Sequence, residues 1–189
     1  MFESMLLGGV PSLVTMTLYT DAFVIRGSTQ TRQARISDIL NQADEEFLVL
    51  SDTIVDEYGT HGTTTRSEFA QVNLAAVLFA VADTDVETRP DLRTPKVSEQ
   101  ALISIPPFRV TGRVHVLPER DLRVALSELT GRFLPVTDAT FWSDALGEAR
   151  QTAPMLAINH HRAQILAPHR ESDPWAGIDR AGEGGPAAG

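Results

Sequence analysis

The sequence predicts a mainly β fold of the α+β kind, organised as two tandem small β-barrels that each carry one short inserted helix. The phrase FLVLSD at Phe47–Asp52 returns as FLPVTD at Phe133–Asp138, which is 86 residues later (133 − 47). Three further pairs of segments recur in the same order at spacings of 85 or 86 residues, and ordered self-similarity of this kind marks a repeated structural unit. Short alternating runs rich in β-branched residues predict that each unit is built mostly of strands.

The first element of each copy is predicted to be a β-hairpin. In both copies two alternating apolar runs flank a short turn, and prolines suit the turn of the second copy because proline cannot donate to a strand ladder. The predicted strands and turns are Val14–Thr20, the turn at Asp21 and Ala22, and FVIRGST at 23–29, then Gln100–Ile105, the corner at Pro106 and Pro107, and Phe108–Val116.

The next segment of each copy changes to the period of a helix. Apolar residues follow the spacing i, i+3, i+4, which places them on one helical face. They are Ile36, Ile39 and Leu40 in the first copy and Leu122, Ala125, Leu126 and Leu129 in the second.

Each copy is predicted to end in a long strand followed by a second hairpin. The long strands contain the repeated phrase and cover 45–58 and 131–142. A tight turn at Asn73 or Asn159 then precedes a short apolar strand. The resulting boundaries are an N-terminal segment at 1–12, the first barrel at 13–82, a polar linker at 83–99, the second barrel at 100–169 and a disordered tail at 170–189.

Composition excludes several classes of function. The formal charge is −9 and Lys96 is the only lysine, so no broad surface is expected to neutralise nucleic-acid phosphates or an acidic membrane. The absence of cysteine excludes disulfides, thiol catalysis and thiolate zinc sites. No signal peptide or membrane span is recognised, so we expect a cytoplasmic protein.

Residues shared by the two copies are expected to serve the fold. Phe and Leu of the repeated phrase alternate into a core, the glycines mark a bulge or bend, the aspartates satisfy backbone N–H groups at strand ends, and the asparagines form an Asx turn or adopt left-handed geometry. These pairs are Phe47/Phe133, Leu48/Leu134, Gly27/Gly112, Asp52/Asp138 and Asn73/Asn159.

The order of these elements resembles an Sm-like small barrel: a strand, a strand with a glycine, a strand ending in an acidic residue, and a last strand pair with a sharp turn. In the first copy the resemblance is carried by Val14–Thr20, FVIRG, FLVLSD and QVNLAAVLFAV. Tandem bacterial domains of unknown function with an inserted helix are also similar, through the segment ISDILN at 36–41. The RNA-reading loops of Sm-like proteins are not found at their expected positions, in keeping with the negative charge.

Function is expected where the copies differ. The segment Gly59–Glu68, with His61 and Arg66, is a candidate anion-binding loop, although a flexible hairpin connection also explains its Gly and Thr content. His160 and His161, with His169 or His115, are candidate metal ligands. Adjacent histidines on a strand point to opposite faces, which weakens that candidate.

The sequence therefore predicts a non-enzymatic binding or assembly module, acting as a scaffold or adaptor, without a cofactor, catalytic residue or bound metal. Its expected partner is another protein or a second copy of itself, as a homo-oligomer, because small barrels leave edge strands that pair with neighbours. The first alternative is a small-ligand or nucleotide sensor that uses Gly59–Glu68. The second is a metal-dependent enzyme that uses the histidines.

Overall fold

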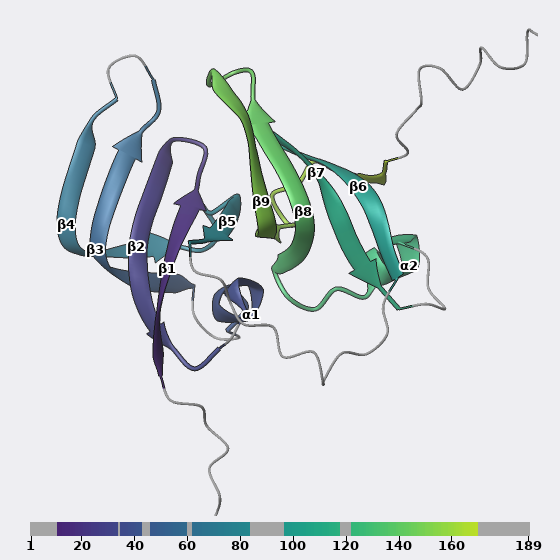
Figure 1. Cartoon of the computed structure of the whole chain (residues 1–189), viewed down its shortest axis with the longest axis horizontal. Coiled ribbons are helices and arrows are strands. Elements are labelled where there is room, and N and C mark those ends of the chain that lie inside the picture. Colours follow the sequence, from purple (N-terminus) through teal and green to yellow (C-terminus); the bar gives the residue numbers. More distant parts are fainter. Residues whose placement is uncertain are drawn as a thin grey trace, which may run out of the picture.

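The computed structural model describes residues 11–33, 35–42, 46–59, 62–83, 97–117 and 122–169 (Figure 1). Within these residues the chain forms ten strands and two short helices. The elements of the first half are β1 Ser12–Tyr19, β2 Phe23–Thr31, α1 Ile36–Leu40, β3 Phe47–Glu57, β4 Thr64–Asn73 and β5 Phe79–Ala82. Those of the second half are β6 Val97–Ile105, β7 Phe108–Val116, α2 Leu122–Ser127, β8 Phe133–Ser143, β9 Glu148–Asn159 and β10 Ile165–Pro168.

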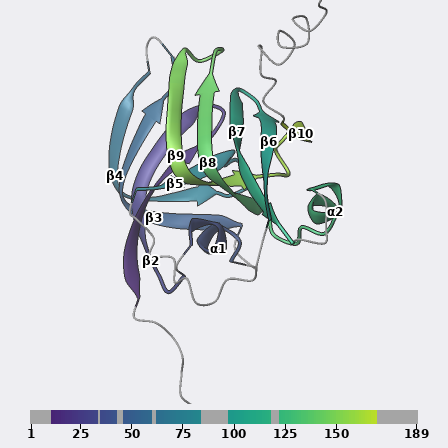
Figure 2. The same ribbon diagram turned by 45° about the vertical axis from the view of Figure 1, so that its right-hand side comes forward.

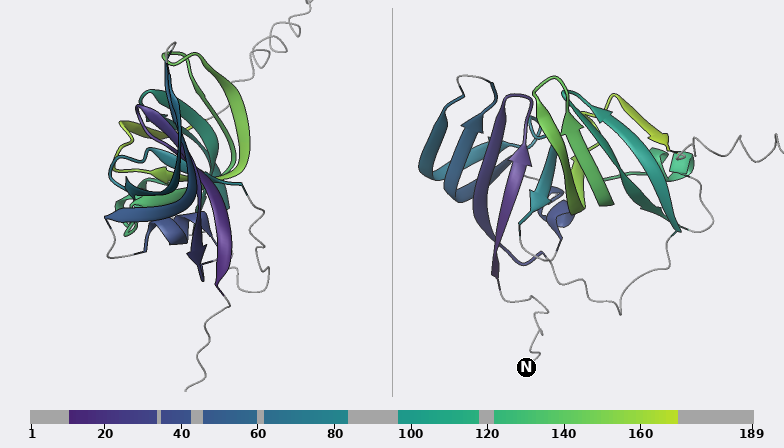
Figure 3. Two further views of the ribbon diagram at one scale, coloured as in Figure 1. Left: turned by 90° about the vertical axis from the view of Figure 1, so that its left-hand side faces the viewer. Right: turned by 45° about the horizontal axis from the view of Figure 1, so that its top comes forward.

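The strands form one antiparallel sheet in the order β10-β6-β7-β8-β9-β5-β1-β2-β3-β4. The sheet is strongly twisted and curved, and in the right-hand view of Figure 3 its strands fan out from the blue β3-β4 hairpin at one end to the yellow β10 at the other. The sheet does not close, so two of its strands, β4 and β10, are its edges. The expectation of a mainly β protein is confirmed, and each half has one short helix. The expected pair of tandem closed barrels is not confirmed, because the ten strands form one open sheet.

The two halves repeat one strand order and one register. β5-β1-β2-β3-β4 in the first half corresponds to β10-β6-β7-β8-β9 in the second. Leu18 lies opposite Ala80 across β1 and β5, and Ile103 lies opposite Leu166 across β6 and β10, at the spacings of 85 and 86 found in the sequence. Corresponding positions of the two halves can therefore be compared residue by residue.

A β-bulge interrupts the same place in each half. The pairing of β2 with β3 shifts around Gly27, and that of β7 with β8 shifts around Gly112, as predicted for glycines within strands. A Cβ atom built on Gly112 would lie 2.5 Å from Cγ1 of Val136, so the neighbouring strand approaches too closely for any side chain. Glycine is therefore required at the bulge of the second half.

The aspartates of the repeated phrase have a different position from the one predicted. Asp52 and Asp138 lie inside β3 and β8, not at strand ends, and both have positive φ values, 52° and 49°. Each stands at the bulge opposite its half's glycine. At each bulge the aspartate adopts the left-handed conformation, which aspartate tolerates better than most residues.

The predicted second hairpins are wrong. β4 does not pair with β5, and β9 does not pair with β10; instead β5 pairs with β1, and β10 pairs with β6. Asn73 Oδ1 accepts a hydrogen bond from the Ala75 amide at 2.8 Å, which is the expected Asx turn. The turn is a sharp corner that sends the short fifth strand to the far side of the half, against the first strand.

The halves share their cores. Phe133 and Ala157 of the second half pack in the cluster formed by α1 and the first-half strands, and Leu78 and Phe79 of the first half pack in the cluster of the second. Figure 2 shows α1 beneath the region where the halves join and α2 at the outer end of the second half. The two sets of strands therefore fold as one continuous structure.

Some sequence expectations lie outside the described residues. These are the disordered tail at 170–189, most of the N-terminal segment and most of the linker. The linker prediction is too long at one end, since Val97–Glu99 pair with Val114–Val116 as the start of β6. Among the described helices, neither has the length and apolar character needed to cross a membrane.

Candidate functional site

The histidines lie in a turn and not on a strand as predicted. His160 and His161 follow the end of β9, and their ring centroids are 4.4 Å apart at 76°. His160 Nε2 lies 2.7 Å from the carbonyl oxygen of Gly131. Burial lowers the pKa of His161, and the neighbouring His160 lowers it further. The His160 side chain therefore has a local partner beside the turn.

Among the described residues, His160 and His161 have no third metal ligand near them. Within the described part of the chain, no three His, Asp or Glu side chains are grouped closely enough to hold a metal ion. His169 follows β10, where its amide donates to the carbonyl of Gln100 at 2.8 Å, and His115 Nε2 lies 2.7 Å from Thr137 Oγ1 on β8. The candidate ligands thus lie in three separate places: the turn after β9, the end of β10 and strand β7.

The candidate anion-binding loop is shorter than predicted. Its second part, from Thr64 onward, is strand β4, where Arg66 lies opposite Ile54 and Thr65 lies opposite Val55. The β-branched threonines suit this extended pairing. His61 lies outside the described residues.

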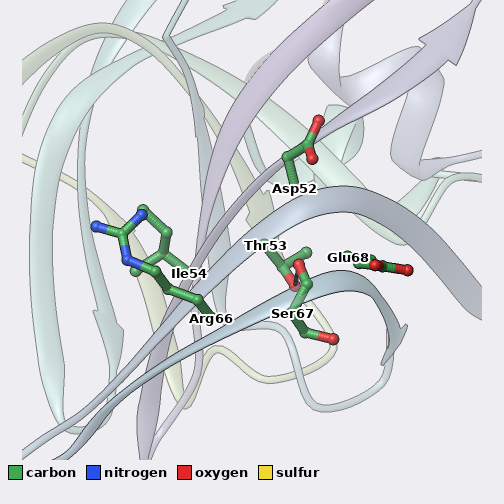
Figure 4. Close-up of a pocket in the computed structure, with 6 residues that line it drawn as sticks. All are labelled: Asp52, Thr53, Ile54, Arg66, Ser67 and Glu68. Atoms are coloured by element: carbon green, nitrogen blue, oxygen red, sulfur yellow. Dashed lines mark hydrogen bonds between the residues drawn. The ribbon is translucent and has the colours of Figure 1, made fainter.

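Arg66 does line a shallow hollow of about 380 Å³ on the outer strands. Figure 4 shows its guanidinium beside Ile54, while Asp52 and Glu68 lie on the other side of the hollow. Two carboxylates opposite one guanidinium give the hollow no net positive charge. An anion would therefore meet repulsion there as well as attraction.

A larger hollow of about 720 Å³ lies between the halves and is aromatic and acidic. Its wall includes Tyr19, Tyr58, Asp56, Glu57 and Glu148. The hydroxyl of Tyr58 is buried and has no hydrogen-bond partner among the described residues. Burial raises the pKa of Tyr58, and Glu148 raises it further. The tyrosine is thus held neutral next to the acidic rim.

The unpartnered hydroxyl makes Tyr58→Phe a specific test. Removing a buried hydroxyl that lacks a partner should leave the free energy of unfolding unchanged or raise it by up to about 1 kcal/mol. The raised pKa means that the unfolded chain ionises first, so the wild-type protein should lose stability as pH rises above 10.0, and Tyr58→Phe should reduce that loss. Urea denaturation of the wild-type protein and of Tyr58→Phe at pH 7 and pH 10.5 measures both effects. A loss above 1 kcal/mol at pH 7 would mean that the hydroxyl has a partner.

A hydrogen-bonded polar cluster lies at the junction of the halves. β5 pairs with β9 through Phe79–Ile158, Ala80–Ala157 and Val81–Leu156. Asn159 is buried, and its amide nitrogen donates to the carbonyls of Leu74 and Val77 at 3.3 and 2.8 Å.

A second asparagine fastens α1 to the other half at this junction. Asn41 follows α1, donates to the Phe133 carbonyl at 2.8 Å and accepts from its amide at 2.7 Å. The Arg162 guanidinium adds a hydrogen bond to the Ala75 carbonyl at 3.1 Å and lies 3.6 Å from Asp21. Sequence reasoning missed Asn41, and it singled out the segment Asn159–Arg162 for its histidines and not for Arg162. The counterparts of Asn41 and Arg162 in the other copy are Ser127 and Ala76, and this difference in type is a signal that the copies meet the rest of the chain differently.

The outer face of the β4 edge is apolar and exposed. Phe47 lies opposite Asn73, Val49 opposite Gln71 and Ser51 opposite Phe69, so these side chains share one face of the sheet. Phe69 is 64% exposed, and Phe47 and Val49 are also exposed. Among the described strands none pairs with the outward side of β4, so this edge combines backbone groups that face away from the sheet with an apolar patch, which together are the candidate functional site.

Comparison with protein-family models, with curated proteins and with solved structures finds no match to this chain.

Proposed function

We propose that this protein is a non-enzymatic binding and assembly module, built from two copies of an Sm-like small barrel, that takes up a strand of a protein partner along β4. The observation that carries the proposal is the open β4 edge with Phe47, Val49 and Phe69 exposed beside it. Proteins usually shield an edge strand with charge, proline or a covering element, because its free N–H and C=O groups template pairing with another chain. An apolar face next to a free edge is suited to a bound strand.

The backbone of β4 presents its groups in the pattern that strand addition requires. Leu74 N donates to Glu46 O at 2.9 Å, so residues 74, 72 and 70 direct their backbone groups toward β3. The alternate residues, Asn73, Gln71 and Phe69, therefore direct theirs away from the sheet. A partner strand would bond to these odd-numbered positions.

The two alternative functions have weaker support. The hollow beside Arg66 contains two carboxylates, which does not favour a nucleotide or another anion. The described histidines lie apart from any third ligand, which does not favour a metal-dependent enzyme. Strand addition at β4 needs only the outward backbone groups of the strand and the apolar side chains beside it.

Photo-cross-linking from the edge tests this proposal. A benzophenone amino acid at position 69, in protein made in its native cells, should form a covalent adduct with another polypeptide. The same probe at Thr65, which is exposed on the same strand but lies before the apolar patch, is the matched control. Gln71→Pro should abolish the adduct at position 69, because proline removes an outward N–H without disturbing the ladder to β3. Adducts that survive Gln71→Pro, or that never form, would refute strand addition.

A further inference from the structure

The pairing of strands at the internal junction of the sheet suggests how the two edge strands of the sheet would pair between copies. There, the fourth strand of the second half, β9, pairs with the fifth strand of the first half, β5. Outside the junction, the corresponding strands are β4 and β10, and both are edges of the sheet. Strand β10 of a second copy could thus pair with β4 of the first copy as β5 pairs with β9 within the chain.

Residues that are buried at the junction have counterparts that are exposed on the two edge strands. Phe133 is 2% exposed at the junction, whereas its counterpart Phe47 is 41% exposed at the free edge. Phe79 is fully buried in β5, whereas its counterpart Ile165 in β10 is 56% exposed. Asn159 is likewise buried and Asn73 exposed. Equivalent positions keep apolar or amide side chains at both places, but only the junction covers them.

We propose that β10 of a second copy pairs with β4, in the register of the internal junction, to give a head-to-tail assembly. This inference rests on the proposed function, since it names the partner that fills the β4 edge. The corresponding pairs are Ile165 with Val72, Leu166 with Gln71, and Ala167 with Ala70, by the spacing of 86 residues from the pairs of β5 and β9. The contact joins two different surfaces, so an open assembly has a free β4 edge at one end and a free β10 edge at the other. Such an assembly either closes into a ring or grows as a filament.

The backbone of β10 permits this pairing. Pro168 lacks an N–H, but its counterpart Ala82 lies outside the three pairs that join β5 to β9. Helix α2 precedes β10 in the order of elements of the second half, as α1 precedes β5 in the first.

One contact of the junction is not repeated. Asn41 corresponds to Ser127, whose hydroxyl donates to the Val124 carbonyl at 2.7 Å, so the two amide bonds to the backbone of Phe133 have no equivalent. The contact between copies therefore depends on strand pairing and on burial of Phe47, Phe69 and Ile165. We expect it to be weaker than the internal junction and dependent on protein concentration.

The absence of cysteine allows a clean disulfide test of the register. Asn159 N donates to Leu78 O at 2.8 Å, so Leu156 and Val81 form a non-hydrogen-bonded pair, whose Cα atoms lie about 4.5 Å apart in antiparallel sheets. That distance suits a disulfide. The corresponding positions on the free edges are Ala70 and Ala167, and both are half-buried, so cysteine is a small change there.

Mixing Ala70→Cys protein with Ala167→Cys protein under mild oxidation should give a disulfide-linked dimer of one variant with the other. Its yield should exceed that of the control mixture, Thr65→Cys with Ala167→Cys, by roughly ten-fold or more, because docking raises the local thiol concentration. The double variant Ala70→Cys/Ala167→Cys should give a ladder of covalent dimers, trimers and higher species. Circular dichroism of each reduced variant verifies folding.

A dimer linked mainly between two Ala70→Cys chains, or a yield no greater than the control, would overturn the head-to-tail contact. The photo-cross-linking result then separates the two proposals. Adducts at position 69 with a different polypeptide would leave strand addition intact and remove only the second copy as its partner. Absence of any adduct would remove both.

Discussion

Phe133→Ala is expected to destabilise the protein by about 3–5 kcal/mol, the usual cost of truncating a fully buried phenylalanine. Phe133 is 2% exposed and packs in the cluster of α1 and the first-half strands, so its loss leaves a cavity at the junction. The matched change, Phe47→Ala, removes the same side chain from the corresponding position of the other half. Because Phe47 is exposed at the free edge, its truncation should cost about 1 kcal/mol or less.

Urea denaturation of dilute protein, followed by circular dichroism, compares the two variants. The difference between their losses in free energy of unfolding measures how much more the junction stabilises its phenylalanine than the free edge does. Equal losses for Phe133→Ala and Phe47→Ala would contradict the asymmetry between the halves. A small loss for both would show that the halves do not share a core.

Gly112→Val should destabilise the protein by about 1–3 kcal/mol through overpacking at the bulge. A Cβ atom at position 112 would lie 2.5 Å from Val136 Cγ1 and 3.0 Å from the Thr137 carbonyl oxygen, and the latter is backbone that cannot simply rotate away. Opposite it, Asp138 has a φ of 49°, which glycine adopts without strain. Asp138→Gly should therefore be neutral or slightly stabilising, whereas Asp138→Val should cost about 1–2 kcal/mol.

Thermal and urea denaturation of these three variants give the comparison. The expected order of stability places Asp138→Gly first, Asp138→Val below it and Gly112→Val lowest or level with Asp138→Val. A neutral Gly112→Val would contradict the close approach of β7 and β8 at the bulge. A strongly destabilising Asp138→Gly would mean that the carboxylate, and not the backbone conformation, is what the position requires.

Local features of the fold are predictable from this sequence because they depend on neighbours in the chain. Alternation and β-branched residues place β7 at Phe108–Val116, and the i, i+3, i+4 spacing places α1 at Ile36–Leu40. Gly27 and Gly112 mark the bulges. The repeat spacing of 86 residues also predicts the matching registers of the two halves.

Features that depend on distant partners are not predictable in this way. Phe47 and Phe133 begin nearly identical phrases, yet the prediction that both enter a core is wrong for Phe47, because only Phe133 meets another half. The pairing of β5 with β1 and β9, where a hairpin with β4 was expected, is likewise decided by tertiary contacts. The positive φ of Asp52 follows from a bulge that needs both strands to form.

The sequence predicted the kind of candidate site, an edge strand, but not its residues. The expectation that edge strands serve assembly follows from the size of each unit, but the sequence pointed to Gly59–Glu68 and to the histidines as the distinctive segments. The exposed patch instead consists of Phe47, Val49 and Phe69, which read as ordinary alternating strand residues. Their exposure depends on β4 being the end of the sheet, which no local pattern records.

The most direct test of the central claim, that β4 is an assembly surface filled by another copy, is the solution mass by light scattering over a range of concentrations. The wild-type protein should form species with masses that are multiples of the 20.6 kDa chain, and the Gln71→Pro variant should remain at 20.6 kDa with an unchanged circular dichroism spectrum. A wild-type protein that stays at 20.6 kDa at every concentration would contradict the claim.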